Sequence, residues 1–159
     1  EENFYFLAMV TDDVYSMNIT PYTPDQMWQG DNIQFSIDDR LEINPVDAGV
    51  INELSIGKLN GFGDICYRHS SYYGLPVAQI VENMDICIKR YEGYTVYEIA
   101  APWSEILQPG FVPSTDRTYR FSVMINENDG TGRKGWMEYN SGIGASKQVD
   151  LFGTLKLYK

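Results

Sequence analysis

The chain has 159 residues, enough for one domain but too few for two of ordinary size. Its 22 acidic and 12 basic residues give a formal net charge of −10, which argues against nucleic acid or an anionic membrane as a partner. The longest strongly apolar run, 4–10, is far shorter than the roughly 18 residues of a membrane span. A single histidine, His69, leaves little room for a Ser-His-Asp triad or a multi-histidine zinc site.

Several short segments predict β-strands. The run 4–11 is almost continuously apolar, which is typical of a central strand covered on both faces. Four further segments alternate apolar and polar residues with a period of two, as half-buried strands do: 33–37, 84–88, 97–99 and 121–125. The segment 155–157 is predicted as a last short strand. Gly, Asn, Asp and Pro turns separate them, so we predict an all-β fold, an antiparallel β-sandwich of the jelly-roll kind.

Helix signals are nearly absent. The segment 102–107 can form one or two turns before Pro109 and Gly110 stop it, so at most one short helix is expected. Without a repeat, a low-complexity tract or a linker, the sequence predicts one domain over residues 1–159.

Aromatic residues make up 14% of the chain, and tyrosine is the commonest of them. They suit the pleated surface of a sheet, and they also suit a binding face, because a rigid ring buries area at low entropic cost. Composition leaves both interpretations open.

Two features concern the compartment. Cys66 and Cys87 lie on neighbouring strand-like segments, and their spacing matches no zinc site. The sequence leaves two alternatives open, one disulfide or two buried thiols. A disulfide would indicate an oxidising compartment. Asn18, Ile19 and Thr20 form an N-glycosylation sequon, which is weak evidence for secretion.

Four segments in order carry a resemblance that covers nearly the whole chain. They read LAMVTDDV at 7–14, WQGDNIQFSID at 28–38, YEIAAPWSE at 97–105 and FSVMINENDG at 121–130, the last continuing through GWME at 135–138 to FGTL at 152–155. In this order and spacing the chain resembles the family 9 carbohydrate-binding modules, which are non-catalytic β-sandwiches attached to polysaccharide-degrading enzymes. The resemblance implies a secreted, extracellular protein that binds a polysaccharide or an oligosaccharide.

The resemblance also implies a sugar slot in which aromatic planes clamp a sugar. Trp28 matches the first clamp tryptophan, Gln34 stands where other members carry an acidic residue, and Arg133 matches a polar contact. The second clamp tryptophan is missing from the stretch 144–149, and Tyr72 or Tyr73 is a candidate substitute. The other two tryptophans, Trp103 and Trp136, are expected in the core.

A structural calcium ion is the second site that the resemblance implies. Asp12, at the end of the first strand, and Asp31, before the strand at 33–37, match acidic positions that recur in the family. Calcium takes six to eight oxygen ligands, so two carboxylates would need backbone help. The alternative is that both residues only cap turns.

Three functions compete. The first is a non-catalytic carbohydrate-binding module of a secreted protein. The second is a structural or adhesive extracellular sandwich that has lost the sugar slot and assembles with other chains; because the resemblance implies leading strands that this sequence lacks, a neighbouring chain could add a strand. A glycosidase using Glu98, Glu105 or Glu138 is the least favoured, because nothing fixes a carboxylate pair across a cleft, and we predict no enzyme.

Overall fold

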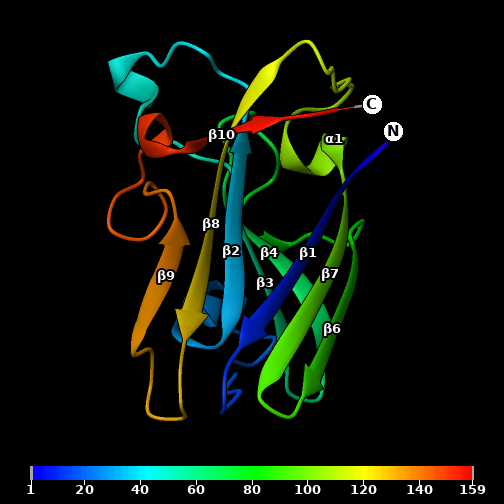
Figure 1. Ribbon diagram of the computed structural model, residues 1–159, viewed down its shortest axis with the longest axis vertical. Coiled ribbons are helices and arrows are strands. Elements are labelled where there is room, and N and C mark those ends of the chain that lie inside the picture. Colours follow the sequence, from blue (N-terminus) through cyan, green and yellow to red (C-terminus); the bar gives the residue numbers. More distant parts are fainter. Residues whose placement is uncertain (1, 159) are drawn as a thin grey trace.

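The computed structural model describes residues 2–158 and arranges them as two facing antiparallel sheets (Figure 1). The smaller sheet has the order β1-β7-β6. Its strands are β1 (Asn3–Thr11), β6 (Asp85–Tyr91) and β7 (Tyr94–Pro102). The hairpin between β6 and β7 turns at Gly93, whose φ of 79° suits a residue without a Cβ.

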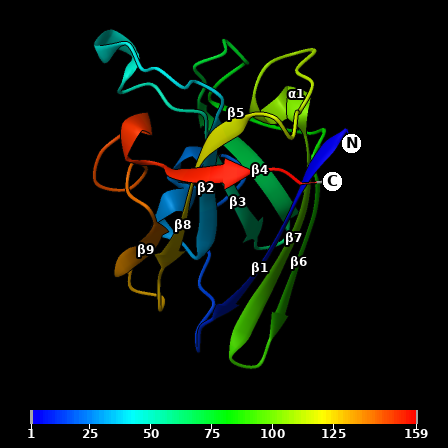
Figure 2. The same cartoon turned by 45° about the horizontal axis from the view of Figure 1, so that its top comes forward.

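The larger sheet has seven strands. Six of them follow the order β10-β8-β2-β3-β4-β5, and the seventh, β9, also pairs with β8. Their bounds are β2 (Asn32–Asp38), β3 (Glu53–Leu59), β4 (Gly63–Ser70), β5 (Gln79–Ile80), β8 (Thr118–Glu127), β9 (Gly135–Tyr139) and β10 (Gly153–Lys156). Every pairing is antiparallel, which confirms the predicted sandwich. β1 begins and β10 ends at the same end of the molecule (Figures 1 and 2).

Helical structure is sparse, as predicted. The one α-helix among residues 2–158 is α1 (Trp103–Ile106), inside the segment expected to form it. Three short 3-10 helices complete the set among these residues: η1 (Pro24–Gln29), η2 (Pro45–Asp47) and η3 (Val149–Leu151). No helix within the described residues is long and apolar enough to cross a membrane.

The main core fills the space between the sheets. Its largest fully buried side chains include Tyr119 and Phe35, which come from neighbouring strands of the larger sheet. Trp103 is buried at the edge of this core, with its ring 5.5 Å from Phe4 and 5.8 Å from Phe111, so its predicted core position is confirmed.

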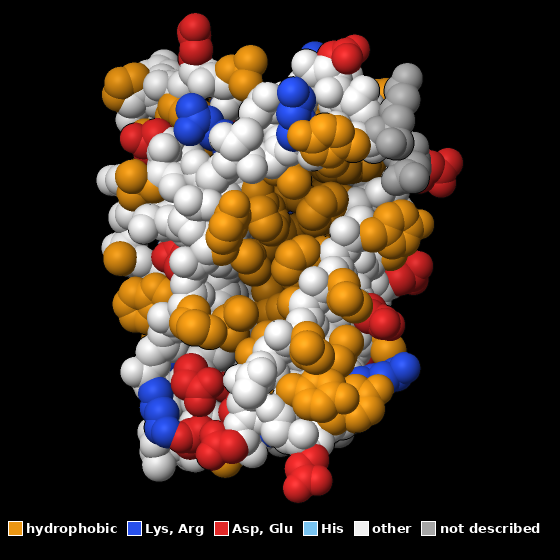
Figure 3. Space-filling model, in the orientation of Figure 1, with side chains coloured by type: hydrophobic (Ala, Val, Ile, Leu, Met, Phe, Trp, Pro, Cys, Tyr) orange, Lys and Arg blue, Asp and Glu red, His pale blue; other side chains and the backbone are white. Residues whose placement is uncertain are grey.

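β1 is an edge strand, and the prediction that it lies centrally was wrong. It pairs only with β7 in the described structure, and its outward side chains Tyr5, Leu7 and Met9 are 66%, 67% and 69% exposed. Phe4 and Phe6 point the other way and pack against the core. Beside this edge, an apolar hollow opens over β2 between β8 and β1 (Figure 3).

The two cysteines are free thiols, so of the two alternatives that the sequence left open the disulfide is not formed. Cys66 is fully buried in the core, and this burial raises the pKa of its thiol. Cys87 lies on β6 between Ile86 and Ile88, which face the core, so its own side chain points to the outer face of the smaller sheet.

Candidate functional site

The second face of the larger sheet is polar and yet covered. Along β2, Ile33, Phe35 and Ile37 enter the main core, whereas Gln34 and Ser36 point to the opposite side. The sequence pattern predicts that this polar side is exposed, but every residue of β2 is buried. The expectation of a half-buried strand was therefore wrong.

Two segments cover this polar face. η1 lies over β3 through Met27, whose Cε is 2.9 Å from where a Cβ at Gly57 would stand. The segment 141–149 packs onto β8 through Ile143 and Val149, which form a small core with Met124. Trp28, next to Met27 on η1, is thereby placed at the edge of the covered face.

A hydrogen-bonded chain of polar side chains runs across the covered face. The Nδ2 of Asn126 donates to the Oε1 of Gln34 at 2.9 Å and to the Oδ1 of Asn32 at 2.6 Å. The Nε2 of Gln34 donates to the Oε1 of Glu53 at 2.7 Å, and the Nζ of Lys147 reaches the same oxygen at 2.7 Å. The orientation of the Gln34 amide is therefore fixed by both neighbours.

A cavity of about 320 Å³ lies at this place. It brings together all three residues predicted to hold a sugar, Trp28, Gln34 and Arg133. Trp28 is 39% exposed, so its indole is not packed away in a core. The remaining lining residues are Asp25, Glu53, His69, Met124, Ile143, Gly144 and Lys147.

A second tryptophan stands beside the cavity, where the sequence predicted a core residue. Trp136, on β9, is 44% exposed. The Arg133 guanidinium carbon lies 4.3 Å from the ring centroid of Trp136 and 5.6 Å from that of Trp28. A Cβ at Gly144 would come within 2.4 Å of the Trp136 Nε1, so the absence of a side chain there lets the indole lie against the loop. The core prediction for Trp136 was wrong.

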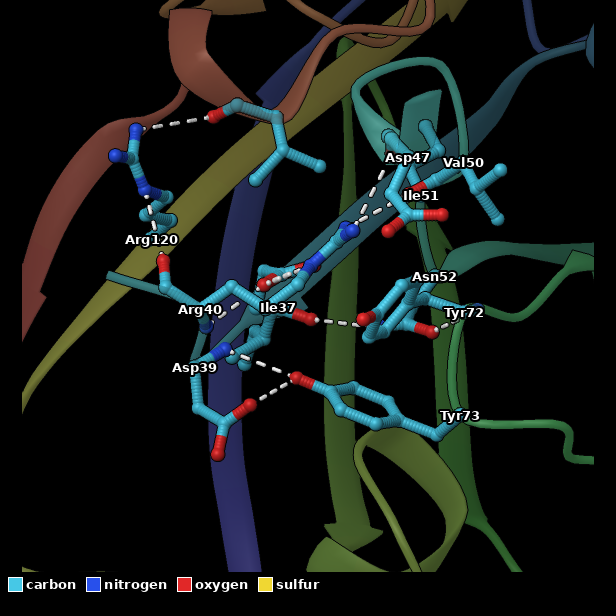
Figure 4. A network of polar contacts seen from close by, with 12 residues as sticks. Ile37, Asp39, Arg40, Asp47, Val50, Ile51, Asn52, Tyr72, Tyr73 and Arg120 are labelled. Carbon is cyan, nitrogen blue, oxygen red and sulfur yellow. Dashed lines mark hydrogen bonds and ion pairs between the residues drawn. The ribbon is translucent and has the colours of Figure 1, made fainter. Parts of the chain in front are cut away.

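Tyr72 and Tyr73 do not supply the second aromatic plane. They lie beside the C-terminal end of β2, whereas Trp28 lies just before its N-terminal end. The guanidinium of Arg40 stacks 3.6 Å above the Tyr72 ring, and the Tyr73 hydroxyl donates to Asp39 (Figure 4). Both tyrosines hold the loop between β4 and β5 in place.

Asp31 is engaged by the backbone. Its Oδ1 accepts from the amide of Asn128 at 2.6 Å, and its Oδ2 accepts from the amide of Ser16. Burial raises the pKa of Asp31 to about 6, although both amides favour the charged form and lower it, while the nearby Asp12 raises it further.

Asp12 instead groups with two carboxylates that the sequence analysis did not select. Oxygens of Asp12, Asp13 and Asp129 lie within 4.8 Å of one another. Asp12 also pairs with Arg90 at 3.3 Å, and Asp129 pairs with Lys134 through its Oδ2. The Oδ1 of Asp129 is buried, and no group of residues 2–158 forms a hydrogen bond with it. An all-oxygen set of this kind suits Ca²⁺, with carbonyls and water to complete it.

The three glutamates considered for glycosidase chemistry do not line the cavity. Glu98 is exposed on β7, and Glu138 accepts hydrogen bonds from the amides of residues 143 and 144. Glu105 is bound by Arg68 at 2.8 Å. Burial raises the pKa of Glu105, but hydrogen bonds from Arg68 and Asn83 outweigh it and hold that pKa below the usual value.

Asn18 is exposed between β1 and η1. Its Nδ2 donates to the Oγ of Ser16 at 3.2 Å. The predicted sequon is thus on the surface, where a glycan needs it.

Comparisons with known proteins agree with this architecture. The family model described as "Carbohydrate family 9 binding domain-like" matches residues 1–159. A family 9 module from Caldicellulosiruptor kristjanssonii, solved with cellotriose, is similar with a TM-score of 0.69 and 17% identity over 98% of this chain and 69% of that one. The same kind of module from that organism, solved with glucose, gives a TM-score of 0.70 and 19% identity over 99% and 72%. A comparison with curated protein sequences gave no significant match. At these identities the two structures establish the fold, and the match to the family model over the whole chain shows that it belongs to carbohydrate-binding module family 9.

Proposed function

We propose that this chain is a non-catalytic module that binds the end of a polysaccharide or oligosaccharide in the cavity beside Trp28. The observation that carries the proposal is the partly exposed Trp28 indole at the edge of a cavity floored by the Gln34–Glu53–Lys147 network. A pyranose offers apolar C–H faces to an aromatic ring and hydroxyls to amide, carboxylate and ammonium groups. The two similar structures were solved with cellotriose and with glucose.

The network has hydrogen-bonding capacity left for hydroxyls. Among the described residues, Gln34 and Lys147 both donate to the Oε1 of Glu53, so its Oε2 is available to accept. The ammonium of Lys147 has three donors and uses one of them on Glu53. These groups bind and orient a sugar without any bond being broken.

Trp28→Ala is expected to weaken the binding of glucose, cellobiose and cellotriose about tenfold to a hundredfold, because stacking aromatics are typical hot spots of binding. Isothermal titration calorimetry of the two proteins measures this. Tyr5→Ala is the matched control, since it removes an exposed aromatic ring from the outer face of the other sheet. Equal affinities in the wild type and Trp28→Ala would eliminate the Trp28 slot.

We infer that the protein is secreted and works outside the cell. Support comes from the family, whose model is described as a carbohydrate-binding domain, and from the exposed sequon at Asn18. Intact-mass analysis of the protein from its native source tests the sequon: a mass without a glycan would remove that support.

A structural or adhesive role through strand addition is the second candidate. β1 is a nine-residue edge strand that contains no charged residue, Pro or Gly, and such an edge is prone to pair with another strand. In this candidate a second copy pairs with β1, and Leu7→Lys, which places a charge on the edge, dissociates the pair. Size-exclusion chromatography with light scattering decides it: a wild type that is monomeric at every concentration would contradict this role.

We also propose that Asp12, Asp13 and Asp129 hold a structural calcium ion. The buried and unpartnered Oδ1 of Asp129 and the closeness of three carboxylates support the site. Asp31, the other residue expected to bind the ion, would act through its backbone contacts beside the site.

A further inference from the structure

Arg133 lacks the kind of partner that the other arginines have. Its only hydrogen bond within residues 2–158 is a long one, 3.8 Å from its Nη2 to the sulfur of Met124. The other five arginines all donate to or pair with oxygens: Arg40 with Asp38, Arg68 with Glu105, Arg90 with Asp12, Arg117 with Asp39, and Arg120 with backbone carbonyls. In a chain with 22 acidic residues and 12 basic ones, an arginine without an oxygen partner is unusual.

The unused donors of Arg133 lie at the wall of the cavity. Its Nε is buried and has no hydrogen-bond partner in the described part of the chain, and burial lowers the pKa of the guanidinium. A buried donor without an acceptor costs stability, and such a group is commonly satisfied by a water, an ion or another bound molecule. Because Arg133 lines the cavity, a molecule bound there can supply an acceptor for its guanidinium.

The surroundings of Arg133 restrict how it can move. The guanidinium carbon lies 4.3 Å from the ring centroid of Trp136 and 5.6 Å from that of Trp28, so contacts with two indoles restrain the group. A guanidinium held in this way presents its N–H groups along its edge. That arrangement matches the two oxygens of a carboxylate, which accept two parallel hydrogen bonds.

The local charge permits an anion to enter. Of the two acidic residues that line the cavity, Glu53 is already paired with Lys147, and Asp25 is exposed. Gln34, which also lines the cavity, is neutral. An anion that approaches Arg133 therefore meets little of the repulsion that a surface of net charge −10 exerts on anions elsewhere.

We propose that the sugar bound in this cavity carries a carboxylate, so that the ligand is a chain ending in a uronic acid whose carboxylate accepts hydrogen bonds from Arg133. This inference rests on the proposed function, since it uses the same cavity and the same Trp28 platform. It adds the chemical class of the sugar and assigns Arg133 as the residue that determines it.

Matched sugar pairs test this, because glucuronate and glucose, or galacturonate and galactose, differ only at C6. In at least one pair, calorimetry is expected to show that the uronate binds about tenfold more tightly than its neutral partner, because it gains a charge-assisted bidentate contact. Arg133→Gln should abolish that preference, and Arg133→Lys should keep only part of it. Raising NaCl from about 50 to about 500 mM should narrow the preference in the wild type.

Arg117→Gln is the control variant. It removes the same charge from an arginine that lies outside the cavity and pairs with Asp39, so the preference should be unchanged. Thermal melting shows whether Arg133→Gln is folded; if it is not, the salt dependence and Arg133→Lys carry the test. Neutral sugars that bind the wild type as tightly as the uronates would overturn this inference and leave the proposed function standing. Failure of both kinds of sugar to bind the folded wild type would overturn both.

Discussion

Replacing Asp31 by alanine is expected to lower the free energy of unfolding by about 3 kcal/mol, because two buried backbone amides lose their acceptor and each such loss costs roughly 1–3 kcal/mol. Those amides belong to Ser16 and Asn128, so one carboxylate joins the segment after β1 and the segment after β8 to the start of β2. Burying the Asp31 carboxylate, which raises its pKa, itself costs stability. The expected loss is therefore smaller than the full cost of leaving both amides without an acceptor.

Urea unfolding of wild type, Asp31→Ala and Asp31→Asn measures this effect. Asparagine keeps one carbonyl oxygen as an acceptor, so its loss should be about half that of alanine. Asp116→Ala, at an exposed turn, is the control and should stay within about 0.5 kcal/mol of the wild type. An Asp31→Ala protein as stable as the control would refute the role of Asp31 as a backbone clamp.

The same variant should also weaken sugar binding. The side chain of Asn128 donates to the carbonyl of Gln29 at 2.6 Å, one residue after Trp28. Asp31 holds the amide of Asn128, so its removal loosens the segment that places the indole at the cavity. Asp31 and Asn128 do not line the cavity, so Trp28 is positioned through the backbone by residues outside it.

Several of the strands that face the main core could be predicted from the sequence, because one apolar row is enough to reveal a period of two. β3, which also faces this core through Leu54 and Ile56, was not predicted. Ile33, Phe35 and Ile37 predicted β2, and the same pattern predicted most of β8. β9 was missed because it has exposed apolar side chains on both faces, Trp136 on one and Met137 and Tyr139 on the other. Alternation of hydrophobicity fails where neither face is a core.

β1 shows the opposite failure. Its apolar residues on both faces predicted a central strand, yet Tyr5, Leu7 and Met9 face outward at the edge of a sheet. Hydropathy reports the preference of a side chain and does not report how many neighbours a strand has. The number of neighbours depends on pairing between segments far apart in the chain, which a single sequence does not encode locally.

The site was predicted in part. Trp28, Gln34 and Arg133 followed from the resemblance to a family, and the structure places them around one cavity. Glu53 and Lys147 were missed because Glu53 reaches Gln34 from 19 positions away and Lys147 reaches Glu53 from 94 positions away, and no local pattern marks them. The polar residues that alternate along β2 were the available signal, since a covered polar face needs polar partners.

Calcium is expected to raise the melting temperature of protein that has been treated with a chelator. In the mass-action relation, an ion that binds only the native state adds about 2.7 kcal/mol when its free concentration is a hundred times its dissociation constant. The physical reason is the mutual repulsion of Asp12, Asp13 and Asp129, whose oxygens lie within 4.8 Å of one another and which a divalent cation would neutralise. Magnesium should act more weakly, because it demands a more regular shell of ligands.

Two variants locate the ion. Asp129→Asn removes the charge of the residue whose Oδ1 is buried without a partner, and it should abolish most of the rise in melting temperature. Asp31→Asn should lower the melting temperature at every calcium concentration and keep the rise, because both oxygens of Asp31 already accept backbone amides. If Asp31→Asn lost the response and Asp129→Asn kept it, the ion would instead sit between Asp12 and Asp31. A melting temperature that changes with neither chelator nor added calcium would mean that the three carboxylates bind no calcium and are only hydrated charges at this end of the sandwich.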